Sequence, residues 1–219
     1  MNVSEEQVRA GQAAYTKGNL RLYDFVVLGL TNHLIWNCPT KRLLQQYDKH
    51  ITANHLDVGV GTGHFLDHCR FPSQTPRIAL SDINPDSLEF AARRIARHTP
   101  ETYLRNVLEP ISHDAANFDS VGINYLFHCL PGTMEDKTVI LDHLIALMNP
   151  NAVLFGSTLL QGGVSRSWLA RRLMAFYNKK GIFSNQNDDL DGLKQALIQR
   201  FRDVSIEIVG CAALFAGRI

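Results

Sequence analysis

The sequence predicts an α/β domain built on a doubly wound, mainly parallel sheet of seven strands whose last strand is antiparallel. Two observations support this fold class. From residue 55 onward, short apolar runs alternate with amphipathic helical segments, a pattern typical of parallel strands joined by helical crossovers. The last two apolar runs, 203–210 and 211–219, are too close for a helix between them, so they predict a closing antiparallel hairpin.

The first fifty residues hold helical patterns and no alternating strand pattern. Ser4 is suited to cap a first helix, and Gln7 completes a capping box with it. A second helical stretch begins near residue 20 and ends at Pro39, because proline interrupts helical hydrogen bonding. The sequence therefore predicts a helical cap or lid over residues 1–49, ahead of a domain formed by residues 50–219.

Five apolar runs separated by helical segments form the body of this domain. Strands are predicted near residues 55–60, 77–84, 101–108, 118–127 and 152–160. Asn84 and Pro85 are typical of a helix start. A helix over 133–150 is predicted to end at Asn149 and Pro150, and two further helical segments, 167–180 and 190–201, precede the hairpin.

Charge and composition argue against several classes of partner. The chain has 22 Lys and Arg against 21 Asp and Glu, a formal net charge of +1, so bulk charge gives no reason to expect a nucleic-acid partner. No apolar run approaches the roughly 18 to 20 residues of a membrane span, and the N-terminus lacks the apolar centre of a signal peptide. We therefore expect a cytoplasmic protein with no membrane partner.

The cysteines give no sign of a disulfide framework or a metal site. Cys38, Cys69, Cys129 and Cys211 lie far apart and share no metal-ligand spacing with histidines. Structural zinc sites and disulfide-rich folds both require such spacings. Reduced thiols and no bound metal are therefore expected.

A glycine turn follows the first predicted strand. Gly59, Gly61 and Gly63 stand at alternate positions, which lets a ligand approach the backbone, and the next helix offers unpaired N–H donors. A dinucleotide-binding turn would need glycine where His64 stands, and no Walker lysine follows. The spacing favours a nucleotide but disfavours a nicotinamide dehydrogenase.

An acidic residue, Asp82, ends the second predicted strand. In sheets of this class an acid at that place accepts hydrogen bonds from ribose hydroxyls. Together with the glycine turn, Asp82 predicts a site for adenosine without a pyrophosphate.

Several motifs together resemble a class I S-adenosylmethionine-dependent methyltransferase. They are DVGVGTG, SDINPDSL, the third strand ending at Asn106, FDSVGINYLFHCLPG and the terminal hairpin. The resemblance covers residues 50–219 and implies the Rossmann-like methyltransferase fold. It also implies S-adenosyl-L-methionine as cofactor and S-adenosyl-L-homocysteine as product.

The resemblance assigns cofactor-binding roles residue by residue. It implies that the methionine end lies among Asp57, Gly59, Gly61 and Gly63, that Asp82 holds the ribose, that Ile83 packs on the adenine, and that Asn106 and Val107 border its edge. Asn124, at the end of the fourth strand, is expected to join this set. Related enzymes often have aspartate where Asn106 stands, but an amide oxygen can also accept a hydrogen bond.

The sequence says less about the methyl acceptor than about the cofactor. The fourth strand ends in NYLF without the prolines of methyltransferases that act on nucleobases or glutamine. This departure favours a small-molecule oxygen, nitrogen or carboxyl acceptor, for example in secondary metabolism. A protein or RNA acceptor is the alternative, and a cofactor-binding protein without catalysis also stays open.

Five residues are predicted to contact the acceptor. They lie before the first strand or after the fourth, and they are Tyr15, Tyr23, His33, Trp36 and His128. His128 follows the fourth strand directly, where the acceptor should face the methyl group. An imidazole there could act as a general base or could orient the acceptor.

Overall fold

The computed structural model describes residues 29–110 and 117–219. A seven-stranded sheet in the order β3-β2-β1-β4-β5-β7-β6 runs through its centre. The strands are β1 (Asn54–Val58), β2 (Arg77–Asp82), β3 (Glu101–Leu104), β4 (Phe118–Asn124), β5 (Met148–Leu159), β6 (Arg202–Val209) and β7 (Ala212–Arg218). Strands β1 to β5 pair in parallel, whereas β7 is antiparallel to both β5 and β6. The predicted sheet, with its antiparallel last strand, is confirmed.

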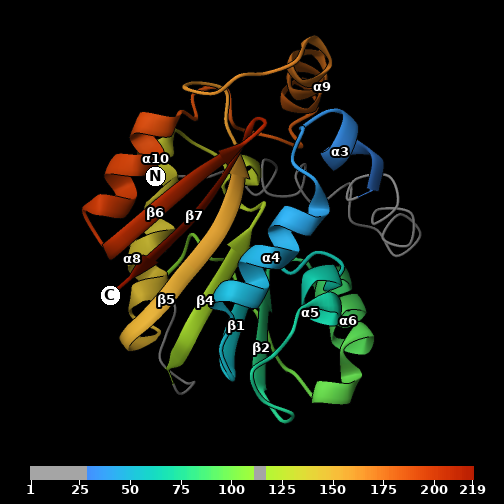
Figure 1. Cartoon of the computed structure of the whole chain (residues 1–219), viewed down its shortest axis with the longest axis vertical. Helices are drawn as coiled ribbons and strands as arrows, with labels where there is room; N and C mark the ends of the chain where they lie inside the picture. Colours follow the sequence, from blue (N-terminus) through green and yellow to red (C-terminus); the bar gives the residue numbers. More distant parts are fainter. Residues whose placement is uncertain (1–28, 111–116) are drawn as a thin grey trace.

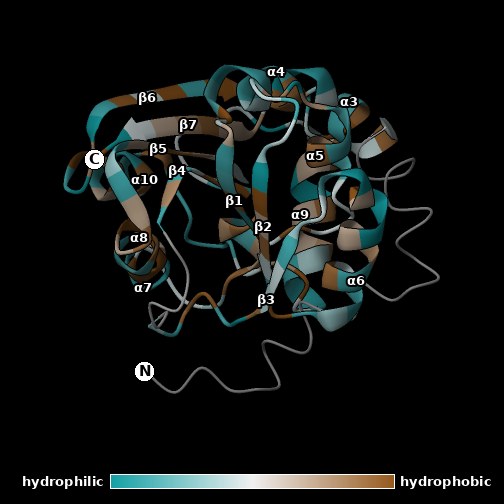
Figure 2. Ribbon diagram, turned by 90° about the horizontal axis from the view of Figure 1, so that it is seen from below, coloured by the Kyte–Doolittle hydropathy of each residue, from teal (hydrophilic) through white to brown (hydrophobic). Residues whose placement is uncertain are grey.

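Helices cover both faces of the sheet (Figures 1 and 2). One face carries α4 (Thr40–His50), α5 (His64–His68) and α6 (Pro85–Arg94), and the other carries α7 (Met134–Lys137), α8 (Val139–Ile145) and α10 (Leu190–Ile198). A short turn, η2 (Ala96–His98), follows α6.

Each face has its own apolar core. Leu144 of α8 and Leu193 of α10 belong to a buried cluster with Val121 of β4. On the opposite face, Leu88 of α6 belongs to a cluster with Leu80 of β2. Because both faces of the central strands are buried, the strands are apolar along most of their length.

The helix predicted over 133–150 divides into α7 and α8, and its end was predicted wrongly. Strand β5 already begins at Met148, so Pro150 lies inside the strand. The register between β4 and β5 shifts here, and Asn151 adopts a positive φ of 65°. A bulge can accommodate a proline because the ladder is interrupted there.

The segment before β1 divides between α3 (Asn32–Leu34) and α4, and α4 packs on the sheet. The Gln46 side chain donates hydrogen bonds of 2.9 Å to the carbonyl oxygens of Gly156 and Phe215. Helix α4 is therefore part of the layer that covers the sheet. The predicted cap over residues 1–49 stays a prediction, because residues 1–28 lie outside the described residues.

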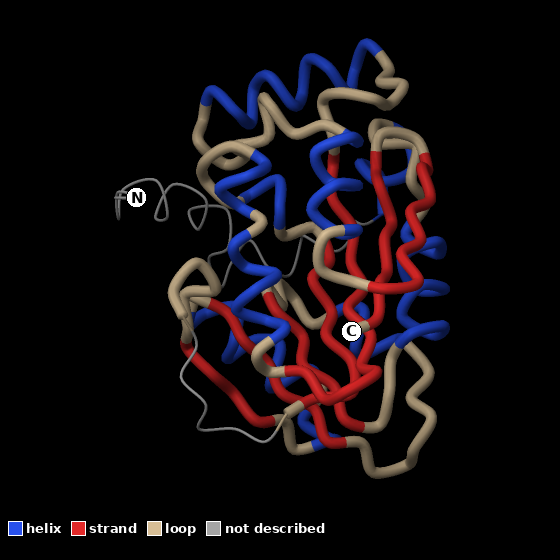
Figure 3. Tube along the Cα trace, turned by 90° about the vertical axis from the view of Figure 1, so that its left-hand side faces the viewer, coloured by secondary structure: helices blue, strands red, loops and turns tan. Residues whose placement is uncertain are grey.

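Helix α9 (Trp168–Lys179) lies beyond the ends of the strands. Figures 1 and 3 place it across one end of the molecule, towards which the arrowheads of β4 and β5 point. It belongs to an excursion, residues 160–189, that leaves β5 and returns at α10. Among the helices described, none is long and apolar enough to span a membrane.

Candidate active site

A cavity of about 120 Å³ opens at the carboxyl ends of β1, β2, β3 and β4. Ligands of doubly wound sheets bind at this edge. Its lining comes from the glycine turn and from the loops after β2, β3 and β4, and consists of Val58, Gly59, Gly61, Ser81, Asp82, Ile83, Asn84, Ser87, Arg105, Asn106, Val107, Leu108, Tyr125, Leu126, Cys129, Leu130 and Pro131.

The glycine turn forms one wall of this cavity. Gly59, Gly61 and Gly63 all have positive φ, at 72°, 52° and 69°. A Cβ added to Gly61 would meet no atom within 4 Å, so the backbone there is open to a ligand. A Cβ on Gly63 would lie 3.0 Å from the Cβ of Ala91 on α6, so this glycine serves the packing of helix against turn.

We expect Gly63→Ala and Gly61→Ala to differ in stability although both place alanine at positive φ. Each substitution costs about 1–2 kcal/mol in backbone strain. Gly63→Ala adds overpacking against Ala91, of about 1–3 kcal/mol. Urea unfolding measures the difference, and Gly61→Ala is the matched control. Equal free energies of unfolding would contradict the packing role of Gly63.

Asp82 presents a carboxylate to the cavity from the end of β2. Its Oδ1 accepts the N–H of Asn84 at 2.9 Å. Burial raises the pKa of Asp82 to about 6, and nearby backbone N–H groups, including those of Asn84 and Gly61, partly offset that rise. An ionised carboxylate that lines a cavity can accept hydrogen bonds from the hydroxyl groups of a ligand.

The loops beside Asp82 supply a mostly apolar surface. Ile83 and Val107 line the cavity, and their contact with the adenine of a cofactor stays a prediction. Asn106 lines it too, but its Oδ1 already accepts the N–H of Leu108 at 3.1 Å, and its Nδ2 donates to Glu109 at 3.0 Å. The amide of Asn106 thus braces its own turn.

Three residues predicted to contact the cofactor, Asp57, Gly63 and Asn124, lie behind the cavity wall. Asp57 is 4% exposed and accepts the Tyr47 hydroxyl at 2.7 Å. Asn124 accepts the Ser157 hydroxyl at 2.8 Å, and its Nδ2 is buried without a hydrogen-bond partner in the described part of the chain. Direct contact between these three residues and a cofactor stays a prediction.

A serine, a histidine and an aspartate also line up beneath the glycine turn. His55 Nδ1 lies 2.8 Å from the Ser120 hydroxyl, and His55 Nε2 lies 3.5 Å from the Asp57 carboxylate. All three residues are at most 4% exposed. A reacting molecule therefore does not reach them, and the group supports the turn from below.

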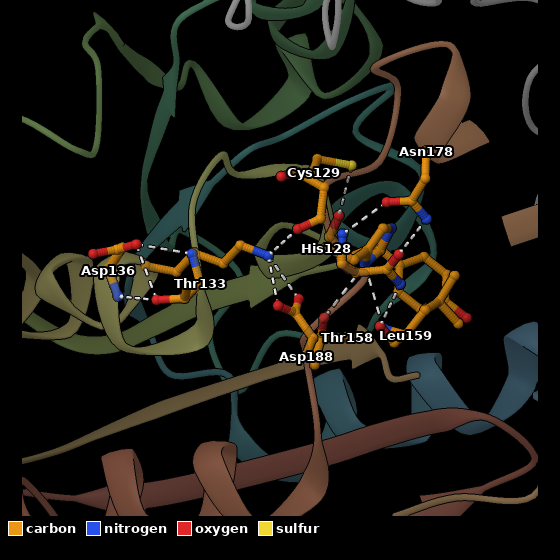
Figure 4. Close-up of polar contacts among 12 residues, drawn as sticks. His128, Cys129, Thr133, Asp136, Thr158, Leu159, Asn178 and Asp188 are labelled. Atoms are coloured by element: carbon orange, nitrogen blue, oxygen red, sulfur yellow. Dashed lines mark hydrogen bonds and ion pairs between the residues drawn. The ribbon is translucent and has the colours of Figure 1, made fainter. Parts of the chain in front are cut away.

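His128 lies in the short turn η3 (Phe127–Cys129) and is 3% exposed. Its Nδ1 accepts the N–H of Leu159 at 3.3 Å (Figure 4). Its ring meets the Phe183 ring edge-on, with 4.5 Å between the ring centroids. Burial lowers the pKa of His128 to about 3, helped by the charge of Lys137. The imidazole is therefore neutral and weakly basic, and the neighbouring Cys129, not His128, lines the cavity.

The other predicted acceptor residues do not line the cavity where they are described. Trp36 is 2% exposed, packs beside Phe183 and accepts the N–H of Cys211 at its carbonyl oxygen. His33 is exposed on α3. Tyr15 and Tyr23 lie outside the described residues. Contact with an acceptor stays a prediction for all four.

Two further residues, Tyr125 and Cys129, line the cavity. The sequence reasoning did not assign Tyr125 to the site, and it placed Cys129 only in the stretch after the fourth strand where the acceptor is expected. Tyr125 lines the cavity with a positive φ of 56°, and its hydroxyl donates to Asn32 at 3.1 Å. Burial raises the pKa of the Cys129 thiol to about 12. The only signal for either residue is its place just after the fourth strand.

Comparison with known proteins agrees with this geometry. A family model described as a methyltransferase domain matches residues 56–154. The chain is 41% identical to demethylluteothin O-methyltransferase of Streptomyces thioluteus, over 96% of this chain and 92% of that protein. It is 35% identical to the physcion biosynthesis cluster O-methyltransferase of Aspergillus chevalieri, over 94% and 93%.

The fold also matches a solved structure of DhpI in complex with S-adenosyl-L-homocysteine. The TM-score is 0.70 at 13% identity, with 99% of this chain and 98% of that chain covered. The similarity to these two relatives extends over nearly the whole length of the chain, and the fold is shared. We conclude that the chain belongs to the class I S-adenosylmethionine-dependent methyltransferases.

Proposed function

We propose that this methyltransferase transfers the methyl group of S-adenosylmethionine to a hydroxyl oxygen of a small molecule. The observation that carries the proposal is the match to two proteins named as O-methyltransferases over more than nine-tenths of this chain. A concave, mostly apolar cavity is of the kind that binds small molecules.

The cavity residues fit S-adenosylmethionine. Asp82 lines the cavity and would accept hydrogen bonds from the ribose hydroxyls, and Ile83 and Val107 would offer apolar surface to the adenine. The open backbone at Gly61 leaves room for the methionine end. The bound cofactor supplies a methyl group on a positively charged sulfur, ready for displacement by a nucleophile.

The acceptor side of the cavity is the wall that follows β4. Tyr125, Leu126, Cys129 and Leu130 line it, and such a wall keeps water away while it holds the acceptor in line with the methyl group. His128 supports this wall from behind. We propose that it positions the acceptor side and does not remove the proton, because a pKa of about 3 makes it a poor base.

Because His128 is a poor base, the acidity of the acceptor hydroxyl becomes important. Among the described residues that line the cavity, the ionisable side chains are Asp82, Arg105, Tyr125 and Cys129. Asp82 is assigned to the ribose, and the pKa of Cys129 is about 12. We therefore favour an acidic hydroxyl, such as a phenol or an enol, over an aliphatic alcohol.

Two measurements test the proposal. Calorimetric titration should give binding of S-adenosylmethionine and S-adenosylhomocysteine but not of NAD. Incubation of a host-cell extract with methyl-labelled cofactor should then place the label in the small-molecule fraction, as an O-methyl group identified by mass spectrometry and NMR. Label in protein or RNA would overturn the proposal in favour of a macromolecular acceptor. Asp82→Ala, with its weakened cofactor binding, serves as the control and should incorporate less label at a cofactor concentration that does not saturate it.

A further inference from the structure

A fully buried ion pair lies beside the acceptor side of the cavity. Lys137, the last residue of α7, places its Nζ 2.7 and 2.8 Å from the two carboxylate oxygens of Asp188. The same Nζ donates to the carbonyl oxygen of Ser184 at 2.6 Å. Both charged side chains are 0% exposed. The three acceptors match the three N–H donors of an ammonium group.

Asp188 also belongs to a clasp at the base of the excursion 160–189. Its carbonyl oxygen accepts the N–H groups of Gln161 and Gly162, at 2.8 and 3.1 Å. The Asn185 side chain donates to the carbonyl oxygen of Leu159 at 2.9 Å. The outgoing and returning ends of the excursion are therefore tied together, and Lys137 joins both to α7.

The clasp continues into the cavity wall. The N–H of Ser184 donates to the carbonyl oxygen of His128 at 2.8 Å, while the His128 ring accepts from Leu159. Cys129, the next residue, lines the cavity. Two hydrogen bonds thus lead from the Lys137 ammonium, through Ser184, to the turn that forms the acceptor side.

Stability alone does not account for a charged pair at this place. Removing two charges from water is costly, and replacement of a buried pair by apolar residues is often neutral or stabilising. The pair supplies directional contacts that apolar residues would not supply. The Lys137 ammonium group holds oxygens of Asp188 and Ser184 at fixed distances from α7.

We propose that Lys137 and Asp188 are positioning residues for methyl transfer: they fix the base of the excursion and, through Ser184, the turn that carries His128 and Cys129. The effect on turnover rests on the proposed function, whereas the effect on local structure does not.

The test compares Lys137→Met, Asp188→Leu and the double variant. Each single variant leaves one buried charge without its partner and should lower the unfolding midpoint sharply. The double variant should regain a midpoint near that of the wild type. If the pair positions the wall, acceptor turnover in the double variant stays about tenfold or more below wild type, and the Cys129, Leu130 and Ser184 amides exchange hydrogen about tenfold or more faster. Binding of S-adenosylhomocysteine should be unchanged.

A matched control uses the ion pair between Arg200 and Asp142, which joins the turn after α10 to α8 near the surface, with 2.7 Å between Nε and Oδ1. Arg200→Met with Asp142→Leu should change neither turnover nor exchange at residues 129, 130 and 184. Recovery of wild-type turnover and exchange together with stability in the Lys137 and Asp188 double variant would overturn the positioning role.

A wild-type measurement covers the case in which the double variant does not fold. The amides of Cys129, Leu130, Ser184 and Gly162 should open as one unit, with a common opening free energy in native-state hydrogen exchange. Independent opening of the Ser184 and Cys129 amides would overturn the proposal. If the wild type did not bind S-adenosylhomocysteine, this result would count against the proposed function. The hydrogen-exchange result would still decide whether the Lys137–Asp188 pair and the turn open together.

Discussion

Replacement of Asp82 by alanine is expected to weaken S-adenosylmethionine binding by about 10- to 150-fold. The expectation follows from the loss of charge-assisted hydrogen bonds to the ribose, worth about 1.5–3 kcal/mol, with each 1.4 kcal/mol equal to about tenfold. Asp82 lines the cavity, and its backbone partners hold the carboxylate in place. Calorimetric titration of the variant measures the change.

Asp191 offers a matched control, because it is an exposed acid in the first turn of α10, away from the cavity lining. Asp191→Ala should leave the dissociation constant unchanged. An unchanged constant in Asp82→Ala as well would remove Asp82 from the cofactor site.

The raised pKa of Asp82 gives cofactor binding a dependence on pH. Hydroxyl donors favour the carboxylate, so affinity should fall as pH decreases through about 6 and level off above it. For the ligand-free protein the sign is opposite. A folded-state pKa above the value of about 3.9 in an unfolded chain makes this group's contribution to stability rise as pH falls from 6 to 4.

The comparison with Asp82→Asn isolates both effects, since other acids titrate in the same range. The advantage of the wild type over the variant in cofactor affinity should shrink as pH falls below 6. Over the same range, the free energy of unfolding of the wild type should rise relative to that of the variant. A wild-type affinity that is level from pH 7 to pH 5 would contradict a pKa near 6.

His128→Ala is expected to lower turnover about 10²-fold while leaving cofactor affinity nearly unchanged. The physical reason is misplacement of the wall, since a displacement of about 1 Å in a reacting group can cost about 10²-fold. The imidazole fills the space between Leu159 and Phe183, so its removal frees the turn that ends at Cys129.

His128→Asn separates positioning from proton removal, because its amide oxygen can still accept the N–H of Leu159. Partial recovery of turnover is expected. Between pH 5 and 8 the dependence of kcat on pH should have the same shape in the wild type and in His128→Asn, since the pKa of His128 is about 3. An inflection that is present in the wild type and absent from the variant would restore the general-base hypothesis. Wild-type turnover in His128→Ala would exclude both roles.

The parts of the site that follow from backbone requirements could be predicted from the sequence. Gly59 and Gly61 stand where φ is positive, and few other residue types suit such places. At Gly61 the wall is also open, because an added Cβ would meet no atom within 4 Å. Asp82 ends a strand at the edge where all parallel strands end. The parallel body of the sheet and its antiparallel end follow from the alternation of strands and helices together with the closing hairpin, whereas the order of the strands is seen only in the folded chain.

The acceptor side could not be predicted in the same way, because it depends on tertiary packing. Trp36 and His128 look like pocket residues by their position in the sequence, yet both are buried by Phe183 from a distant excursion. Lys137 and Asp188 are far apart in the sequence and carry no motif. Only the folded chain brings them together at 2.7 Å.

The place of β7 between β5 and β6 has a consequence for biosynthesis. On the ribosome, β5 emerges with β4 as its partner on one side, and its other edge waits until the excursion, α10 and β6 have all been made. Open strand edges can pair with a foreign strand, and chains lengthen by only about 5–20 residues per second. The nascent enzyme therefore passes through an interval in which its apolar fifth strand is open to association, before the hairpin closes it.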